Sequence, residues 1–467
     1  MNAPRSLTEG SISSGMVRFA LPILYANVLQ SLNGSVNSIW VGRFLGEAAL
    51  TATSNANTVM FLLIGAAFGI ATAATILIGQ CIGAKDIPEA KRVVGTSATF
   101  IAAISVVMAV AGLILSEPLL VLMSTPRASL PLAVAYMRVI FLALPFLYSY
   151  AFVGSALRGA GDSKTPFHFM LLSVAIDIGL NPLFIFGLGP IPALGIAGSA
   201  LATFFAQAIS LIALLTHLYR RRHLLVLHKE EIRHLRIDWT IAGTLVKKGI
   251  PMSAQMLVVS LSAVFMLSLV NNFGVDTTAA FGAALQLWNY IQMPTFAVGM
   301  AVSAMAAQNV GAQKWDRVNA IARVGITFSV AITSAMVLLI ELLDTRAFQI
   351  FLPPGSVALQ IATHLNHIVT WSYVFFGVTM ILFGVVRATG AVMAPLLVLT
   401  LALLFVRIPL AAMLSSRYQI DAIWWSFPIS SALAAVLAVI YYRYGGWRSA
   451  RMAGGPRQGV IAPSPEG

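Results

Sequence analysis

Asp177 is the residue whose type and position could do chemistry, because it is the single acidic side chain that falls in the middle of a predicted membrane-spanning segment. An ionisable group inside a bilayer costs about 2.5–3.5 kcal/mol on insertion scales, so its presence indicates a function. Asn181 follows four residues later, on the same face of a helix. Loss of hydration favours the neutral carboxyl, and carboxylate and amide oxygens also suit a hard cation. The pair predicts a site for H⁺ or Na⁺; the alternative is an Asp that only bonds neighbouring helices.

The composition of the chain places this pair inside a membrane. Of the 467 residues, 58% are apolar and 10% are charged, whereas a water-soluble protein carries about 25% charged residues. This excludes an ordinary globular enzyme. Because one span needs about 20 apolar residues, the long uncharged stretches predict an all-α membrane protein. Splitting them at charges and at Gly and Pro clusters predicts twelve transmembrane helices, near residues 18–42, 55–79, 93–116, 131–156, 166–187, 193–219, 250–272, 278–306, 318–342, 359–384, 394–414 and 422–443.

The basic residues predict how these spans are oriented, because Lys and Arg stay preferentially on the cytoplasmic side. With a cytoplasmic N-terminus, the inner segments hold 23 Lys and Arg residues and the outer loops hold four, namely Arg43, Arg127, Arg346 and Arg417. We therefore expect a multi-pass protein of the plasma membrane, the inner membrane of a bacterium, with both termini cytoplasmic. The net charge of +13 follows from this retention. We expect the lipid bilayer as a partner and no nucleic acid.

Two segments recur and divide the chain into halves. GQCIGAKDIPEAKR at 79–92 returns as AQNVGAQKWDRVNA at 307–320, and LRGAGDSKTP at 157–166 returns as VRATGAVMAP at 386–395. The repeat predicts two homologous six-helix bundles, residues 1–218 and 249–444, around a central cavity. This layout is typical of secondary transporters, which expose one site alternately to each side. No phosphate-binding GxxxxGK[ST] motif is present, so we expect transport driven by an ion gradient, without a cofactor.

The segments outside the two bundles are polar. Residues 219–248 form a basic cytoplasmic linker, which we expect to be an amphipathic helix lying on anionic lipid, with a regulatory site as the alternative. Residues 445–467 are rich in Gly, Pro and Arg, which predicts a disordered cytoplasmic tail. The turn between the fifth and sixth spans is predicted at residues 187–192, GLGPIP.

Several motifs together resemble the multidrug and toxic compound extrusion (MATE) family. They are SVNSIWVGRFLGEAAL in the first span, the paired loops GQCIGAK and AQNVGAQ, LRGAGDSKTP, NPLFIFGLGP followed by LGIAGSALAT, and VRIPL near residue 406. The second-half stretch FGAALQLWNYIQMP resembles the DinF-like branch more than the Na⁺-coupled NorM-like branch. The resemblance implies two lobes around a V-shaped cavity. It also implies a secondary active antiporter, not an enzyme, that exports amphipathic or cationic organic compounds in exchange for H⁺ or Na⁺.

The resemblance also bears on the ion site. Members of the family usually carry an acid in the first span, where this chain has Asn37, and Asn-x-x-x-Asp in the fifth, where it has Asp177-x-x-x-Asn181. We expect Asn37, Asn181 and Thr203 to give hydrogen bonds to Asp177, the coupling carboxylate. One acid in place of two argues against a two-acid mechanism.

The second half has no acid in mid-span. Val259 and Phe376 stand where NorM-like members carry acids, so we expect no cation site there. His364 and His367, near the outer end of the tenth span, are candidates for pH sensing, although we favour plain hydrogen-bonded neighbours. Their spacing permits metal ligation, but no third ligand is evident, so we assign no metal site. We expect Arg407 to brace helices.

Polar and aromatic side chains within the apolar spans are candidates for the substrate cavity. An apolar pocket with few polar groups suits flat amphipathic small molecules, and aromatic faces attract cations. Each amide is equally suited to bridging helices. The candidates are Gln30, Asn33, Gln207, Gln255, Gln286, Trp288, Asn289 and Trp371, with Asn272, Gln292 and Asn366 as further members.

One alternative function remains open. A lipid-linked oligosaccharide flippase of the same superfamily would need a more cationic cavity than Arg138 and Arg407 provide. A membrane-embedded enzyme would need clustered His, Asp or Glu, which the sequence does not indicate. We expect a monomer that moves small organic molecules.

Overall fold

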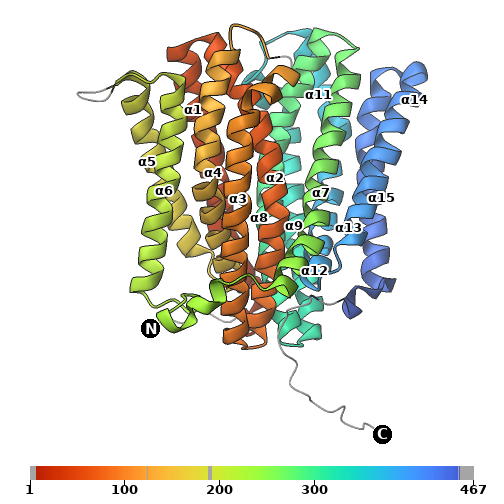
Figure 1. Ribbon diagram of the computed structural model, residues 1–467. Coiled ribbons are helices and arrows are strands. Elements are labelled where there is room, and N and C mark those ends of the chain that lie inside the picture. Colours follow the sequence, from red (N-terminus) through yellow and green to blue (C-terminus); the bar gives the residue numbers. More distant parts are fainter. Residues whose placement is uncertain (1–6, 124, 188–191, 451, 453–467) are drawn as a thin grey trace.

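The computed structural model describes residues 7–123, 125–187, 192–450 and 452. All regular elements in these residues are helices, and the long ones stand side by side as a bundle (Figure 1). The linker between α6 and α7, in green, runs along one end of the bundle. We call this end the terminal face, because residues 7–10 and 446–450 also contact helix ends there.

The first half of the chain consists of six helices and their connections. Each contains an apolar window, with few charged residues, that is long enough to cross a bilayer. The turn predicted between the fifth and sixth helices falls mostly on residues 188–191, which lie outside the described residues. The helices are α1 (Ile12–Leu45), α2 (Glu47–Gly83), α3 (Ile87–Leu122), α4 (Leu130–Gly159), α5 (Lys164–Phe186) and α6 (Ile196–Arg220).

The second half contains shorter and interrupted helices. After the linker, which holds the 3₁₀ helix η1 (Lys229–Leu235), come α7 (Trp239–Asn271), α8 (Val275–Gly311), α9 (Trp315–Leu342), α10 (Asp344–Gln349), α11 (Val357–Val369), α12 (Ser372–Ala388), α13 (Met393–Thr400), the π-helix η2 (Leu401–Arg407), α14 (Ile408–Tyr418), α15 (Ile420–Tyr444) and the 3₁₀ helix η3 (Gly446–Ser449).

Two of the predicted spans are broken in the structure. The tenth is made of α11 and α12, which are bent by 47° at their junction. The eleventh runs from Met393 to Tyr418 and contains the π-helical stretch η2 just before Pro409. Proline has no N–H to donate, so the regular hydrogen-bond ladder is interrupted there. Eleven helices in the described residues are long and apolar enough to cross a membrane, and the bent pair makes twelve, which confirms the predicted fold class.

Helix α2 of the first half crosses α7 and α8 of the second half at glycines, and these crossings join the two halves. A Cβ on Gly69 would lie 2.2 Å from the Gly249 carbonyl oxygen, and a Cβ on Gly83 would lie 1.8 Å from the Gln308 carbonyl oxygen. Gly311 stands in the reciprocal position, where an added Cβ would lie 1.9 Å from the Gln80 carbonyl oxygen. Only residues without a side chain permit backbones to approach this closely, which is a common basis of helix packing in membranes.

Side chains of the repeated loops complete this crossing. Gln80 Nε2 donates to the carbonyl oxygen of Ala388 at 2.7 Å, and Gln308 Nε2 donates to that of Gly159 at 2.9 Å. Each glutamine of one repeat copy therefore binds the second repeated segment of the other half. The N-terminal segment adds to it, since the Leu7 N–H donates to Gln308 Oε1. The two halves are thus tied together at the terminal face.

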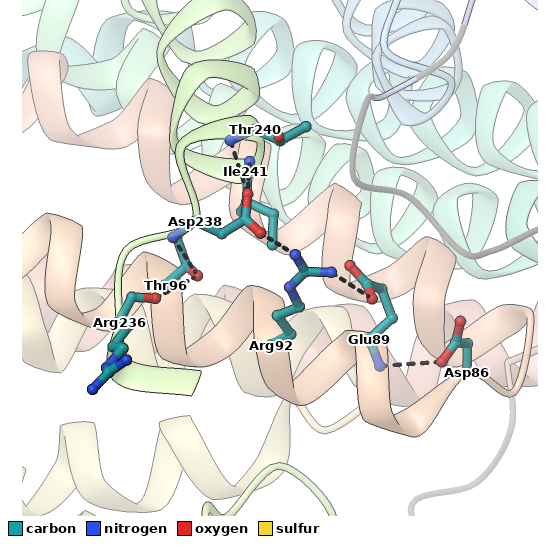
Figure 2. A network of polar contacts seen from close by, with 8 residues as sticks. All are labelled: Asp86, Glu89, Arg92, Thr96, Arg236, Asp238, Thr240 and Ile241. Atoms are coloured by element: carbon teal, nitrogen blue, oxygen red, sulfur yellow. Dashed lines mark hydrogen bonds and ion pairs between the residues drawn. The ribbon is translucent and has the colours of Figure 1, made fainter. Parts of the chain in front are cut away.

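The linker differs from the predicted amphipathic helix. Helix α6 ends at Arg220, η1 is a short 3₁₀ helix, and α7 already begins at Trp239. Instead of lying free, the linker docks on α3. Figure 2 shows the centre of this contact, where Arg92 joins Glu89 and Asp238.

An ion pair and a hydrogen bond to the backbone hold the rest of the linker against α3. Lys91 pairs with Glu231 at 2.7 Å, and Thr99 Oγ1 donates to the Leu235 carbonyl oxygen at 2.8 Å. Gly95 allows this approach, because a Cβ there would lie 2.3 Å from the His234 carbonyl oxygen. Packing of this kind cannot be read from the linker sequence alone, since its partner lies about 140 residues away.

The tail, for which we predict disorder from residue 445, begins with an ordered turn. Trp447 in η3 is buried and stacks on Tyr442, with ring centroids 5.0 Å apart. Its carbonyl oxygen accepts a hydrogen bond from Thr389 Oγ1 at 2.8 Å. Burial of the indole fixes this turn, and residues 451 and 453–467 lie outside the described residues.

Candidate functional site

Three helices of the first half carry the polar residues around Asp177. Asn33 and Asn37 lie one turn apart on α1, Asp177 and Asn181 lie one turn apart on α5, and Thr203 lies on α6. Helix α5 packs against both α1 and α6. Because residues four apart share a helix face, each pair projects into the same space between the three helices.

Asp177 accepts hydrogen bonds on both carboxylate oxygens and is 2% exposed. Its Oδ2 accepts from Asn33 Nδ2 at 2.8 Å and from Asn37 Nδ2 at 3.0 Å. Its Oδ1 accepts from Thr203 Oγ1 at 3.1 Å. Asn181 differs from the expectation, because it does not bond the carboxylate. Its Nδ2 donates to the backbone carbonyl oxygen of Asp177 at 2.9 Å and to Asn37 Oδ1 at 3.0 Å, so it orients Asn37 toward the carboxylate. These neutral donors stabilise the ionised carboxylate in this conformation.

Two buried amide oxygens beside the carboxylate have no hydrogen-bond partner among the described residues. They are Asn33 Oδ1 and Asn181 Oδ1. A buried acceptor that lacks a donor costs about 1–3 kcal/mol. Such oxygens are suited to receive a proton donor that arrives with a change of state, either a protonated carboxyl or an N–H or O–H group of a ligand.

A cavity of about 210 Å³ opens beside this network. Asp177 and its three donors all lie on its wall, together with Gln30, Tyr136, Ser173 and Gln207. The coupling carboxylate expected from the sequence therefore faces enclosed space and is not sealed among side chains. A group entering the cavity would meet the carboxylate and its amides together.

A second cavity of about 500 Å³ adjoins the first toward the terminal face. The two share lining residues from α1, α2, α4, α5 and α6, including Gln30 and Gln207. We call the first the upper cavity and the second the lower cavity. The lower cavity is more apolar, and Tyr148, Phe68 and Phe167 line it. Both cavities lie mainly within the first six helices, with Met300 of α8 closing one side of the lower one.

Comparison with known proteins places this architecture in a family. The MatE family model matches residues 22–183 and 251–413, one segment in each half of the chain. The chain belongs to the MatE family. This membership confirms the resemblance drawn from the sequence, and it makes the protein a multi-pass membrane transporter and not an enzyme.

Relatives of this MatE chain align over nearly its whole length. It is 38% identical over 439 residues to the "Probable multidrug resistance protein YoeA" of Bacillus subtilis (strain 168), covering 94% of this chain and 95% of that one. It is 30% identical over 446 residues to the "Probable multidrug resistance protein YpnP" of the same organism, covering 95% and 98%.

A solved structure has the same fold as this MatE chain. It is described as the outward-facing conformation of a multidrug resistance MATE family transporter of the MOP superfamily, and it superposes with a TM-score of 0.86 at 20% identity. The match covers 95% of this chain and 97% of the solved one. At this identity the likeness concerns the fold.

In the MatE chain, the residues predicted to line the substrate cavity do so in the first half and not in the second. Gln30, Asn33 and Gln207 line the upper cavity. Candidates of the second half line neither of the two cavities: Gln286, Asn289 and Trp371 are exposed, Gln255 and Trp288 are buried, and Gln255 Oε1 accepts from Arg387 at 3.2 Å.

Trp288 belongs to a buried network that reaches the face opposite the terminal one. Its Nε1 donates to Thr370 Oγ1 at 3.3 Å, Thr370 bonds Asn366, and Asn366 Nδ2 donates to Glu341 Oε1 at 3.1 Å. Glu341 also contacts His367. The network ties α8 and α9 to the end of α11, where Thr370 caps the helix just before the bend.

The two histidines are hydrogen-bonded neighbours of acids in the structure. His364 Nε2 lies 2.9 Å from Asp421 Oδ1, and His367 Nε2 lies 3.4 Å from Asp344 Oδ2. Sequence reasoning did not foresee these partners, because they come from α10 and α15. Within the described part of the chain, no group of three or more His, Cys, Asp or Glu has a metal-binding arrangement.

Three residues that line the cavities were not predicted as lining residues from the sequence. Tyr136 and Tyr148 come from α4, and no regular spacing from other polar residues identifies them in the sequence as cavity residues. Arg158, in the LRGAG repeat, lines the lower cavity, although the sequence is equally consistent with an interface anchor. Asn33 was predicted to line the cavity but not to bond Asp177. Its four-residue spacing from Asn37 puts both on one helix face and could have indicated this contact.

Arg407 makes the contacts of a residue that braces helices. Its Nε donates to Ser430 Oγ at 2.8 Å and its Nη2 to Ser431 Oγ at 3.3 Å, both on α15. Its guanidinium lies 4.4 Å from the ring centroid of Phe427 on the same helix. This residue thus joins the π-helical stretch η2 to the last span of the transporter.

Proposed function

We propose that this protein is a secondary active antiporter that exports amphipathic or cationic organic compounds in exchange for H⁺. Asp177 is its coupling carboxylate, and Asn37, Asn181 and Thr203 position it. Gln30, Asn33 and Gln207 contribute to the substrate cavity. The observation that carries the proposal is a 2% exposed carboxylate on a cavity wall, held by donors from two other helices. The names of the relatives YoeA and YpnP support multidrug export.

The orientation of the donors favours H⁺ over Na⁺. Na⁺ is a hard cation that is bound by oxygen atoms. Asn33 and Asn37 turn their N–H groups toward Asp177, and Asn37 Oδ1 is already occupied by Asn181. A bound Na⁺ would require these amides to reorient, whereas a proton needs only one carboxylate oxygen.

Protonation of Asp177 would change what holds the three helices together. The neutral carboxyl accepts weaker hydrogen bonds than the carboxylate, so the ties from α1 and α6 weaken. Its new O–H needs an acceptor, and the unpartnered oxygens of Asn33 and Asn181 lie in the same network. The resulting rearrangement alters the wall of the upper cavity. Proton binding and substrate binding then exclude each other, which is the requirement for exchange.

The distribution of charge supports a cytoplasmic terminal face. Lys91 and Arg92 at the start of α3 contact the basic linker, which runs along this face (Figure 1), and both described ends of the chain also contact helix ends there. Because Lys and Arg are retained on the cytoplasmic side, this distribution supports our proposal of a bacterial inner-membrane protein with both termini inside. We propose that it acts as a monomer, since both cavities form within one chain.

Transport under imposed gradients tests this function. The wild type in inside-out vesicles is expected to accumulate a cationic dye when the lumen is acidic, and not when a Na⁺ gradient replaces the pH gradient. Asp177→Asn should abolish the pH-driven accumulation at normal protein abundance. Asp276→Asn is the matched control, because Asp276 is exposed at the start of α8 and should leave transport unchanged. Normal accumulation by Asp177→Asn would refute Asp177 as the coupling group, and accumulation driven by Na⁺ would refute H⁺ as the ion.

The flippase alternative gains no support from Arg138 and Arg407. Arg138 and Arg407, the two basic residues considered for it, line neither cavity. Arg138 instead donates to Ser116 Oγ at 3.4 Å on α3.

A further inference from the structure

Of the described residues that line the lower cavity, Arg158 is the one with a charged side chain. It lies in the last turn of α4, and its Nη2 donates to Ser155 Oγ, one turn earlier, at 2.7 Å. Among the described residues no carboxylate lies within ion-pair distance of its guanidinium. A guanidinium has five N–H donors in a planar fork that matches the oxygens of a carboxylate or phosphate. Most of these donors are therefore available to a group in the cavity.

The surroundings of Arg158 suit an aromatic molecule that carries this anion. Tyr150, close enough to interact electrostatically with Arg158, has a buried hydroxyl without a partner among the described residues. Phe68, Tyr148 and Phe167 line the same cavity. Its volume of about 500 Å³ lies within the range of pockets that hold drug-sized ligands, about 300–1,000 Å³.

The second copy of the repeat shows that this arrangement is particular to the first half. Arg387 occupies the position of Arg158 in the VRATG segment. Its Nη1 donates to Gln255 Oε1 at 3.2 Å, and it lines neither cavity. Arg387 thus bonds a side-chain amide away from both cavities, with its Nε buried and unpartnered among the described residues, whereas Arg158 faces open space.

We propose that the lower cavity binds the anionic group of an aromatic substrate, a carboxylate, sulfonate or phosphate, through Arg158 and the Tyr150 hydroxyl. The inference rests on the proposed export function and widens its substrates to aromatic anions and zwitterions. The two adjoining cavities carry opposite charges, with Arg158 on the wall of the lower one and Asp177 on the wall of the upper one. Asp177 stands eleven residues beyond Pro166, which lines the lower cavity near Arg158, or about 16 Å along α5. An amphipathic zwitterion would place its anion at Arg158 and its amine toward Asp177.

A matched pair of dyes tests this assignment by binding alone. Tetramethylrhodamine with a free carboxylate and its methyl ester differ by one anionic group. Binding to the purified protein in maltoside detergent is measured by fluorescence anisotropy. Arg158→Gln should weaken binding of the free acid about tenfold or more, because a hydrogen-bonded charge pair is lost, and change binding of the ester less than twofold. Arg138→Gln is the control, since Arg138 is on the same helix, bonds a serine and lines neither cavity.

Each outcome of this experiment decides the inference. Equal weakening of both dyes, or no weakening of the acid, would overturn it while leaving the export function standing. Selective weakening of the acid would support it even if pH-driven transport failed. Absence of binding of both dyes to the wild type would overturn both proposals. A lipid headgroup offers the same phosphate chemistry, so the measurement is repeated in nanodiscs of phosphatidylglycerol. If the wild type binds the free acid ten times more weakly in these nanodiscs than in detergent, the site is assigned to lipid and the substrate assignment is overturned.

Discussion

Asp177 and its neighbours are where sequence and structure agree most closely at the residue scale. The mid-span position of Asp177 and its four-residue spacing from Asn181 are consequences of helical geometry, so they could be predicted. The contacts of Asn37 and Thr203 with the carboxylate follow the expectation drawn from the family resemblance. The side chains of Gln286 and Asn289 show the limit of such reasoning. An amide in an apolar span does not reveal which face its helix turns to a cavity.

Asn37→Asp tests how many acids the site can hold. Asn37 Nδ2 lies 3.0 Å from Asp177 Oδ2, and two carboxylates at this distance cannot both be ionised. The two carboxyls of the variant should therefore hold one proton between them. We expect the pH optimum of dye transport to move upward by about one unit or more. Asn33→Asp serves as a second variant, and an unchanged or acid-shifted optimum in both would contradict the account.

At the element scale, the helices were predictable and their connections were not. Long apolar runs identify a span regardless of what it packs against, but the linker takes its shape from contacts with Lys91 and Arg92 on α3. The same holds for η3, whose Trp447 is ordered by Tyr442 and Thr389. Polar segments with distant partners carry no local signal of those partners.

The docked linker should loosen in acid. The Lys91 hydrogen bond holds the pKa of Glu231 below its ordinary value of 4.5. Burial alone would raise the pKa of Asp238, but the N–H groups of Ile241 and Thr240 and the Arg92 guanidinium lower it below 3.8. Carboxyls with lowered pKa stabilise the docked state above their ordinary pKa, and this stabilisation is lost as pH falls through the lowered values.

Hydrogen exchange of the peptide spanning 229–241, corrected for the intrinsic rate at each pH, measures this effect. Protection should be constant from neutral pH to about 4.5 and fall below about 4. Asp238→Asn should remove part of the protection already at neutral pH, because the charge pair with Arg92 is lost. Loss of protection between pH 7 and 5, or full protection at pH 3, would show that these ion pairs do not hold the linker.

On the scale of the whole molecule, the internal repeat explains how the halves meet. Gln80 and Gln308 exchange contacts across the interface, and Gly83 and Gly311 allow α2 and α8 to cross closely. The sequence showed the repeat but not its purpose, because the pairing between copies exists only after the halves are brought together. For alternating access to occur, this contact must open.

Gly83→Ala tests the tightness of the crossing. The added Cβ would lie 1.8 Å from the Gln308 carbonyl oxygen, so the helices must move apart, at a cost of about 1–3 kcal/mol. We expect a lower midpoint of thermal unfolding in detergent. Gly65→Ala on the same helix is the control, since its Cβ would meet Met256 at an ordinary 3.9 Å. Equal midpoints for Gly83→Ala and the control would mean that the halves are not closely joined at this point.

The central claim, that Asp177 exchanges a proton for substrate, is tested most directly by counting protons. The purified protein in a weakly buffered solution, at a mildly acidic pH, is titrated with a cationic dye while a pH indicator records proton release. The account predicts release of about one proton for each wild-type molecule that binds dye, and no release from Asp177→Asn, which should still bind the dye. Equal proton release from both proteins, or dye binding by the wild type without any release, would contradict the claim.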